Sequence, residues 1–141
     1  MEVSQVMHAN PVCVTMNESM AKIAKKMKEG DFGTVIVLDG SEPQGIITDR
    51  DMVIRAIASG LDMTTITAKD IMTKKLESCN ATDSIIQAAD KMKNKKIRRL
   101  LVLDTKSKPV GILSLGDIAV AASNEEENSA FGALKGVSKK H

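Results

Sequence analysis

The sequence predicts a mixed α/β chain made of two copies of one strand–helix–strand–strand–helix unit. The first observation is internal repetition: Val37-Leu38-Asp39 recurs as Val102-Leu103-Asp104, 65 residues later, and Gly45-Ile46 recurs as Gly111-Ile112, 66 residues later. The second observation is that the offset changes only once, in the polar turn at 105–108, where one added residue is easily tolerated. Because a unit of roughly 55 residues buries little surface alone, we expect the copies to pack about a pseudo-twofold axis.

In the first copy, the spacing of apolar residues predicts each element. Met20, Ile23, Ala24 and Met27 recur three and four positions apart, which is typical of a helix with one buried face. Gly30 is expected to end that helix. The expected elements are a strand at 12–14, a helix at 17–28, strands at 34–38 and 44–47 joined by a turn at 39–40, and a helix at 49–59.

The second copy repeats this order along the chain. The expected elements are a strand at 76–79, a helix at 83–94, strands at 98–103 and 110–113, and a helix at 115–122. The predicted organisation is therefore repeat one at 5–58, a linker at 59–69, repeat two at 70–122 and a flexible polar tail at 123–141.

Composition excludes several classes of function. The formal net charge is only +2, so no strong field favours nucleic acid or a membrane surface. The only histidines, His8 and His141, lie at the two ends, so we expect neither a catalytic imidazole nor a metal site. No apolar stretch approaches the roughly 20 residues of a membrane helix, and no signal pattern opens the chain. We therefore expect a cytoplasmic binding module and not an enzyme.

The most informative motif is a strand that ends in a hydroxyl residue, with aspartate three positions later. It occurs as Thr48 and Asp51, and again as Ser114 and Asp117. One interpretation is a capping box, in which the two side chains satisfy N–H groups at a helix start. The other is a ribose site, in which the carboxylate accepts both sugar hydroxyls while the hydroxyl and N–H groups hold a phosphate. The motif alone leaves both interpretations open.

The repeated block, together with Asp70-Ile71-Met72-Thr73 and the segment from Ile97 to Asp104, resembles the CBS-domain family over about residues 5–122. The resemblance implies a tandem CBS pair, also called a Bateman module, with two clefts between the copies. It implies a regulatory adenine nucleotide (AMP, ADP or ATP) or S-adenosylmethionine as ligand. It also implies a homodimer, and we expect regulation in trans, either on a partner protein or through dimerisation.

The resemblance assigns ligand-binding residues to both clefts. The first cleft is expected to use Thr15, Phe32, Gly33, Thr34, Ser114 and Asp117. The second is expected to use Thr48, Arg50, Asp51, Asn80, Ile97, Arg98 and Arg99. Thr15 also fits a capping box with Glu18, so its role stays open.

The stretch from Lys91 to Arg99 holds six positive charges and no acid, whereas the charges of the matching stretch 26–34 cancel. We expect the second cleft to be the more positive and to prefer a multiply charged nucleotide, because the planar fork of arginine suits phosphate. A solvated helix face is the simpler interpretation of the same stretch. A nucleic-acid-binding regulator that uses residues 91–99 is the alternative function, although the chain has no Trp or Tyr for base stacking. A hydrolase using Asp49 and Asp51 with a metal is a third, weaker alternative.

Overall fold

The computed structural model describes residues 1–74 and 76–128, which form two compact units. The first-repeat unit is Asn10–Leu76, and the second-repeat unit joins Met1–Ala9 to the chain from Glu77 onward. Both units have the predicted strand–helix–strand–strand–helix order, so the predicted α/β class is confirmed. The unit boundaries differ from the repeat boundaries expected from the sequence, because the first nine residues pack with the later half of the chain.

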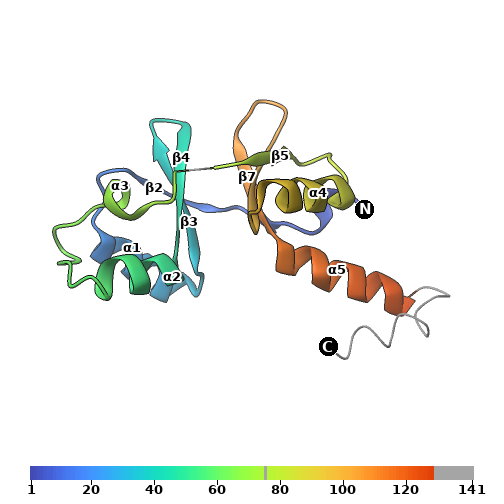
Figure 1. Ribbon diagram of the computed structural model, residues 1–141. Helices are drawn as coiled ribbons and strands as arrows, with labels where there is room; N and C mark the ends of the chain where they lie inside the picture. Colours follow the sequence, from blue (N-terminus) through green and yellow to red (C-terminus); the bar gives the residue numbers. More distant parts are fainter. Residues whose placement is uncertain (75, 129–141) are drawn as a thin grey trace. The chain divides into compact units, whose positions relative to one another are not determined.

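The first-repeat unit is built on a three-stranded sheet in the order β2-β3-β4 (Figure 1). Strand β2 (Val12–Thr15) is parallel to β3 (Thr34–Asp39), and α1 (Met20–Gly30) connects them. Strand β4 (Glu42–Thr48) is antiparallel to β3 and leads into α2 (Asp49–Asp51) and the π-helix η2 (Met52–Ile57). A last short helix, α3 (Ala68–Ile71), completes the unit. The core consists of Val14, Met20, Ile23, Met27, Val35, Val37, Ile47, Met52, Ala56, Ala68, Ile71 and Met72.

Helix α1 begins three residues later than predicted, and it ends at Gly30 as expected. Ser19 is its N-cap and accepts a hydrogen bond from the N–H of Lys22, so the helix starts at Met20. The box proposed for Thr15 and Glu18 does not form. The left-handed residue at the C-terminal end is Asp31 (φ 54°) and not Gly30.

The second-repeat unit contains a four-stranded sheet in the order β1-β7-β6-β5. Strands β5 (Ser78–Asn80), β6 (Arg99–Leu103) and β7 (Pro109–Ser114) follow the same plan, with α4 (Ile85–Lys95) between the first two. The N-terminal segment adds η1 (Val3–Gln5) and β1 (His8–Ala9), which pairs antiparallel with β7. The core consists of Val3, Cys79, Ala88, Met92, Leu100, Val102 and Leu113.

The last helix, α5 (Leu115–Asn128), leaves the end of β7 (Figure 1) and runs six residues beyond the expected end at Ala122. Alanine and glutamate are strong helix formers, and residues 121–127 are rich in both. The remainder of the expected tail, residues 129–141, lies outside the described residues. Within residues 1–74 and 76–128, no helix combines the length and apolar character that crossing a bilayer requires.

In each unit, the sheet pairs with the short segment that precedes the other repeat in the sequence. Thr73 pairs with Ile46 beside β4, and His8 pairs with Ile112 in the equivalent position beside β7. Glycine in β4 makes the approach possible: a Cβ on Gly45 would lie 2.8 Å from both the Sδ of Met72 and the carbonyl oxygen of Thr73. The repeated glycine of the motif is therefore required by the incoming segment.

Candidate functional site

The candidate site in the first-repeat unit is the junction where β4 passes into α2. We call residues 32–34 and 48–51 the first junction. Thr34 opens β3 and lies opposite Thr48 in the sheet register. The N–H of Asp49 donates to the carbonyl oxygen of Gly33 at 2.9 Å, which ties the start of α2 to the start of β3. A Cβ on Gly33 would lie 2.8 Å from Oδ2 of Asp49, so glycine makes room for that carboxylate.

The Thr48–Asp51 pair forms a reciprocal capping box. The Thr48 N–H donates to Oδ2 of Asp51 at 2.9 Å, and the Asp51 N–H donates to the Thr48 hydroxyl oxygen at 3.2 Å. Thr48 is only 7% exposed. The box fixes the aspartate through one oxygen, and Oδ1 accepts no hydrogen bond within residues 1–74 and 76–128. Capping therefore engages one oxygen of the carboxylate and leaves the other without a hydrogen bond from the described residues.

The second-repeat unit carries the equivalent second junction, residues 97–99 and 114–117. The N–H of Leu115 donates to the Arg98 carbonyl oxygen at 2.9 Å. Ser114 and Asp117 form the same reciprocal pair, with N–H to Oδ2 at 2.9 Å and N–H to Oγ at 3.0 Å. The motif therefore has the same backbone geometry in both repeats.

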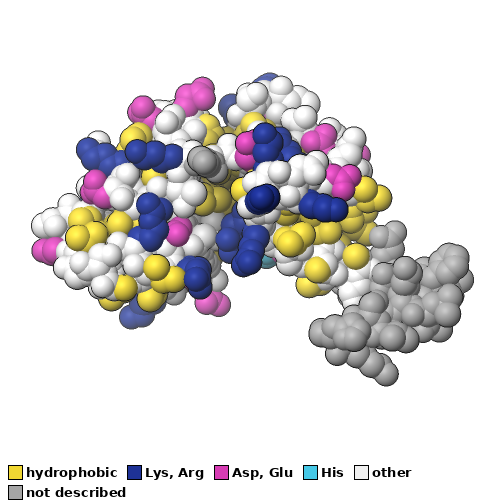
Figure 2. All heavy atoms as spheres, in the orientation of Figure 1, with side chains coloured by type: hydrophobic (Ala, Val, Ile, Leu, Met, Phe, Trp, Pro, Cys, Tyr) yellow, Lys and Arg dark blue, Asp and Glu magenta, His cyan; other side chains and the backbone are white. Residues whose placement is uncertain are grey.

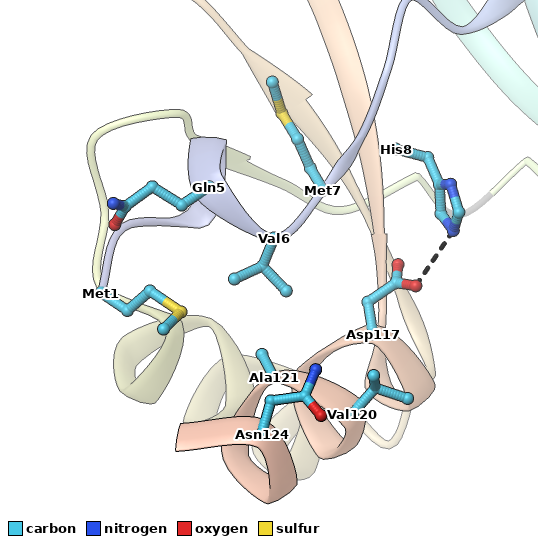
Figure 3. Close-up of a pocket in the computed structure, with 9 residues that line it drawn as sticks. All are labelled: Met1, Gln5, Val6, Met7, His8, Asp117, Val120, Ala121 and Asn124. Atoms are coloured by element: carbon cyan, nitrogen blue, oxygen red, sulfur yellow. Dashed lines mark ion pairs between the residues drawn. The ribbon is translucent and has the colours of Figure 1, made fainter. Parts of the chain in front are cut away.

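His8, which the sequence analysis did not assign to the site, contacts the second junction. Its Nε2 lies 3.0 Å from Oδ1 of Asp117 (Figure 3). The pair borders a groove of about 550 Å³ between the N-terminal segment and α5, which is lined by Met1, Gln5, Val6, Met7, His8, Asp117, Val120, Ala121 and Asn124. The repeat offset aligns His8 with Thr73, but no signal in the sequence indicates the contact of His8 with Asp117.

The two junctions have equivalent hydrogen bonds but carry different charges. Where the first has Gly33 and Thr34, the second has Arg98 and Arg99, both exposed. The charged pair Asp49-Arg50 of the first is Leu115-Gly116 in the second. The second junction therefore carries two exposed arginines, of which Arg99 lies opposite Ser114 in the sheet register.

Part of the basic stretch is engaged elsewhere. The Nζ of Lys91 donates to the Ser78 carbonyl oxygen, and Lys91 and Lys95 each lie 3.9 Å from a carboxylate oxygen of Glu77. On the visible face, Lys and Arg side chains lie among acidic and uncharged ones (Figure 2). These contacts favour a partly neutralised helix face over an unbroken nucleic-acid-binding surface.

Two predicted site residues, Thr15 and Asn80, lie away from the junctions, and two junction residues, Phe32 and Ile97, pack against the cores. Because β2 is parallel to β3, Thr15 pairs with Leu38, roughly 13 Å along β3 from Thr34. Asn80 pairs with Leu103 at the far end of β6 in the same way. Phe32 and Ile97 pack against the hydrophobic cores of their units.

A third pair of the same type shows that the motif can serve capping alone. Thr67 and Asp70 form a reciprocal box at the start of α3. The Thr67 N–H donates to Asp70 Oδ2 at 2.9 Å and holds the pKa of that carboxyl below its usual value. This pair lacks the preceding strand-to-helix junction, so it provides a natural comparison for Asp51 and Asp117.

The chain matches the family model of the CBS domain twice, over residues 3–57 and 68–124. It belongs to the CBS-domain family. The predicted tandem CBS pair is thereby confirmed. The CBS domain-containing protein YhcV of Bacillus subtilis is 34% identical over 130 residues, which cover 92% of this chain and 91% of YhcV.

Solved structures share the fold of this CBS pair. The crystal structure of Hypoxic Response Protein I with two coordinated zinc ions has a TM-score of 0.69 and 31% identity, covering 86% of this chain and 98% of that one. PAE2072 from Pyrobaculum aerophilum, complexed with AMP, has a TM-score of 0.70 and 24% identity, covering 83% and 89%. The CBS pair of MJ0100, complexed with 5-methylthioadenosine and S-adenosyl-L-methionine, has a TM-score of 0.75 and 23% identity, covering 89% and 98%.

Metal-ligating side chains are not gathered in the described part of the chain. No group of three or more His, Cys, Asp or Glu that could hold an ion occurs within residues 1–74 and 76–128. In the first junction, Oδ1 of Asp49 accepts the Arg50 N–H at 2.9 Å, whereas Asp51 is held by Thr48. The two carboxylates therefore have separate partners.

Proposed function

We propose that this CBS pair is a regulatory sensor of an adenosyl ligand and has no catalytic role. The observation that carries the proposal is the repeated junction, in which a main-chain N–H fixes one oxygen of Asp51 or Asp117 beside an exposed chain reversal. The second oxygen of such a carboxylate can accept the hydroxyls of a ribose diol. AMP in PAE2072 and S-adenosylmethionine in MJ0100 support this class of ligand, because both contain that diol.

We propose that Arg98 or Arg99 binds phosphate when the ligand is AMP, ADP or ATP. Both side chains are exposed; Arg99 opens β6 and pairs with Ser114 in the sheet register, and Arg98 immediately precedes it. An arginine fork forms paired hydrogen bonds with phosphate oxygens, which a threonine at the equivalent position of the first junction cannot provide. The sequence analysis assigned these arginines to the cleft of Asp51, whereas the register that pairs Arg99 with Ser114 favours the Asp117 junction. We therefore propose that the first junction is better suited to a ligand or ligand part without phosphate.

The proposed regulation acts on a partner protein. A ligand shifts a partner's state only by the difference in its affinity for the two states, which is typically about 1–3 kcal/mol.

We propose that the chain forms a homodimer through η2, where Val53, Ile54 and Ile57 are 48–58% exposed. Apolar side chains in a row on one short helix are a recognised feature of protein interfaces.

The proposal is tested by calorimetric titration of the full chain with AMP, ADP, ATP and S-adenosylmethionine. Asp51→Asn and Asp117→Asn should each remove one binding site, because an amide has a single oxygen: when that oxygen accepts the capping N–H, the amide NH₂ replaces the oxygen that would accept the diol hydroxyls. Asp70→Asn is the matched control, since it removes an equivalent capping carboxylate outside the junctions, and it should keep both sites. The proposal is contradicted if folded Asp51→Asn and Asp117→Asn proteins bind as many ligands as the wild type.

A further inference from the structure

We propose that His8 sets the order in which the two ribose-binding aspartates are filled, with Asp51 occupied first and Asp117 second. The inference rests on the proposed function and adds a specificity-determining residue to it. His8 lies outside both sequence motifs, in the segment that β1 attaches to the second-repeat unit.

Both oxygens of Asp117 are engaged in the ligand-free chain. Oδ2 accepts the Ser114 N–H at 2.9 Å, and Oδ1 lies 3.0 Å from Nε2 of His8 (Figure 3). A ribose diol needs that second oxygen, so the imidazole occupies the place of the sugar hydroxyls. The carboxylate side chain is 16% exposed, whereas His8 is 81% exposed. The ring can therefore rotate into solvent without disturbing the core, which makes it a displaceable competitor.

The first junction has no equivalent of this competitor. Thr73 takes the place of His8, because Thr73 pairs with Ile46 as His8 pairs with Ile112. The Thr73 hydroxyl accepts a hydrogen bond from Nη1 of Arg55 at 3.4 Å. Oδ1 of Asp51 accepts no hydrogen bond from the described residues, so a ligand meets an open acceptor there. Displacing His8 is a cost that only the Asp117 site bears.

The test measures adenosine binding, because adenosine has the diol and no phosphate. Asp51→Asn isolates the Asp117 site, and Asp117→Asn isolates the Asp51 site. In the first background, His8→Thr should tighten adenosine binding roughly three- to tenfold, which corresponds to the loss of one competing hydrogen bond. In the second background, the reciprocal Thr73→His should weaken adenosine binding, because it places an imidazole at the position equivalent to His8. Unchanged or weaker binding in His8→Thr overturns the inference.

A second measurement separates this inference from the proposed function. Imidazole proton resonances of the ligand-free chain report the contact directly, and a His141→Gln variant assigns the only other histidine of the sequence. Asp117→Asn should shift the His8 resonances, whereas Asp70→Asn should not. Absence of adenosine binding in every variant overturns both proposals. Adenosine binding without an effect of His8→Thr overturns only the role of His8.

Discussion

At the scale of single residues, the two cysteines have contrasting surroundings that their chemistry should reveal. Cys79 on β5 is 7% exposed and belongs to the core of the second-repeat unit. Its burial, reinforced by the nearby charge of Asp83, raises its pKa to about 11. Cys13 on β2 is exposed, and partial burial raises its pKa as well.

We expect Cys13 to react with a disulfide reagent well before Cys79. At pH 8 a thiol of pKa near 11 is ionised in about one molecule per thousand, and only the thiolate attacks. The reactive fraction of Cys79 should grow as the pH rises toward that pKa. Absorbance during reaction with the reagent should show a fast and a slow phase. Cys13→Ser should remove the fast phase, and urea should merge the two; a single fast phase for both thiols in the folded chain would contradict the burial of Cys79.

Single residues also show what sequence reasoning can and cannot locate in a site. Thr48 with Asp51, and Ser114 with Asp117, were predictable because their hydrogen bonds join residues three apart in one motif. The contact of His8 with Asp117 spans more than a hundred residues, so no local pattern contains it. The repeat offset aligns His8 with Thr73, but alignment alone does not bring either side chain to an aspartate.

At the scale of elements, periodicity predicted which elements exist, and local caps determined where they begin and end. Helix α4 starts after Ser84, whose hydroxyl accepts the Gln87 N–H, and α1 starts after Ser19 in the equivalent position. The sequence does not distinguish Ser19 from Thr15 as a cap, because both precede an apolar run. Segment η2 has π-helical geometry with Met52 and Ala56 buried, and the spacing of apolar residues does not distinguish this geometry from an α-helix.

The exposed face of η2 provides the prediction at this scale. If Val53, Ile54 and Ile57 form the dimer contact, Ile54→Lys should convert the dimer to a monomer, because a buried unpaired charge is costly. Sedimentation equilibrium measures the change. The matched control is Ile86→Lys on α4, where the isoleucine is 71% exposed, and that variant should remain dimeric. A wild-type chain that stays monomeric at all concentrations would exclude the homodimer, and a dimeric Ile54→Lys would exclude this face.

At the scale of the whole molecule, duplication was readable from the sequence and the exchange of segments was not. The offset shows that Met7 and Met72 are equivalent residues. It does not show that Met7 lies against Gly111 of the second repeat, while Met72 lies against Gly45 of the first. That choice depends on contacts between distant parts of the chain. Each unit therefore contains a strand-like segment that comes from outside its own repeat.

Because residues 1–9 pack with the second-repeat unit, we expect a residue of that segment to stabilise the second repeat. Val3 is fully buried among Cys79, Leu100 and Val102, and its N–H donates to the Asp83 carbonyl oxygen at 2.8 Å. Val3→Ala removes two methyl groups from this core and should lower the free energy of unfolding by about 2 kcal/mol. Urea unfolding measures the loss. Val120→Ala on α5, where valine is 62% exposed, should change stability by less than about 0.5 kcal/mol. Equal stability of the two variants would show that residues 1–9 are not part of the second-repeat core.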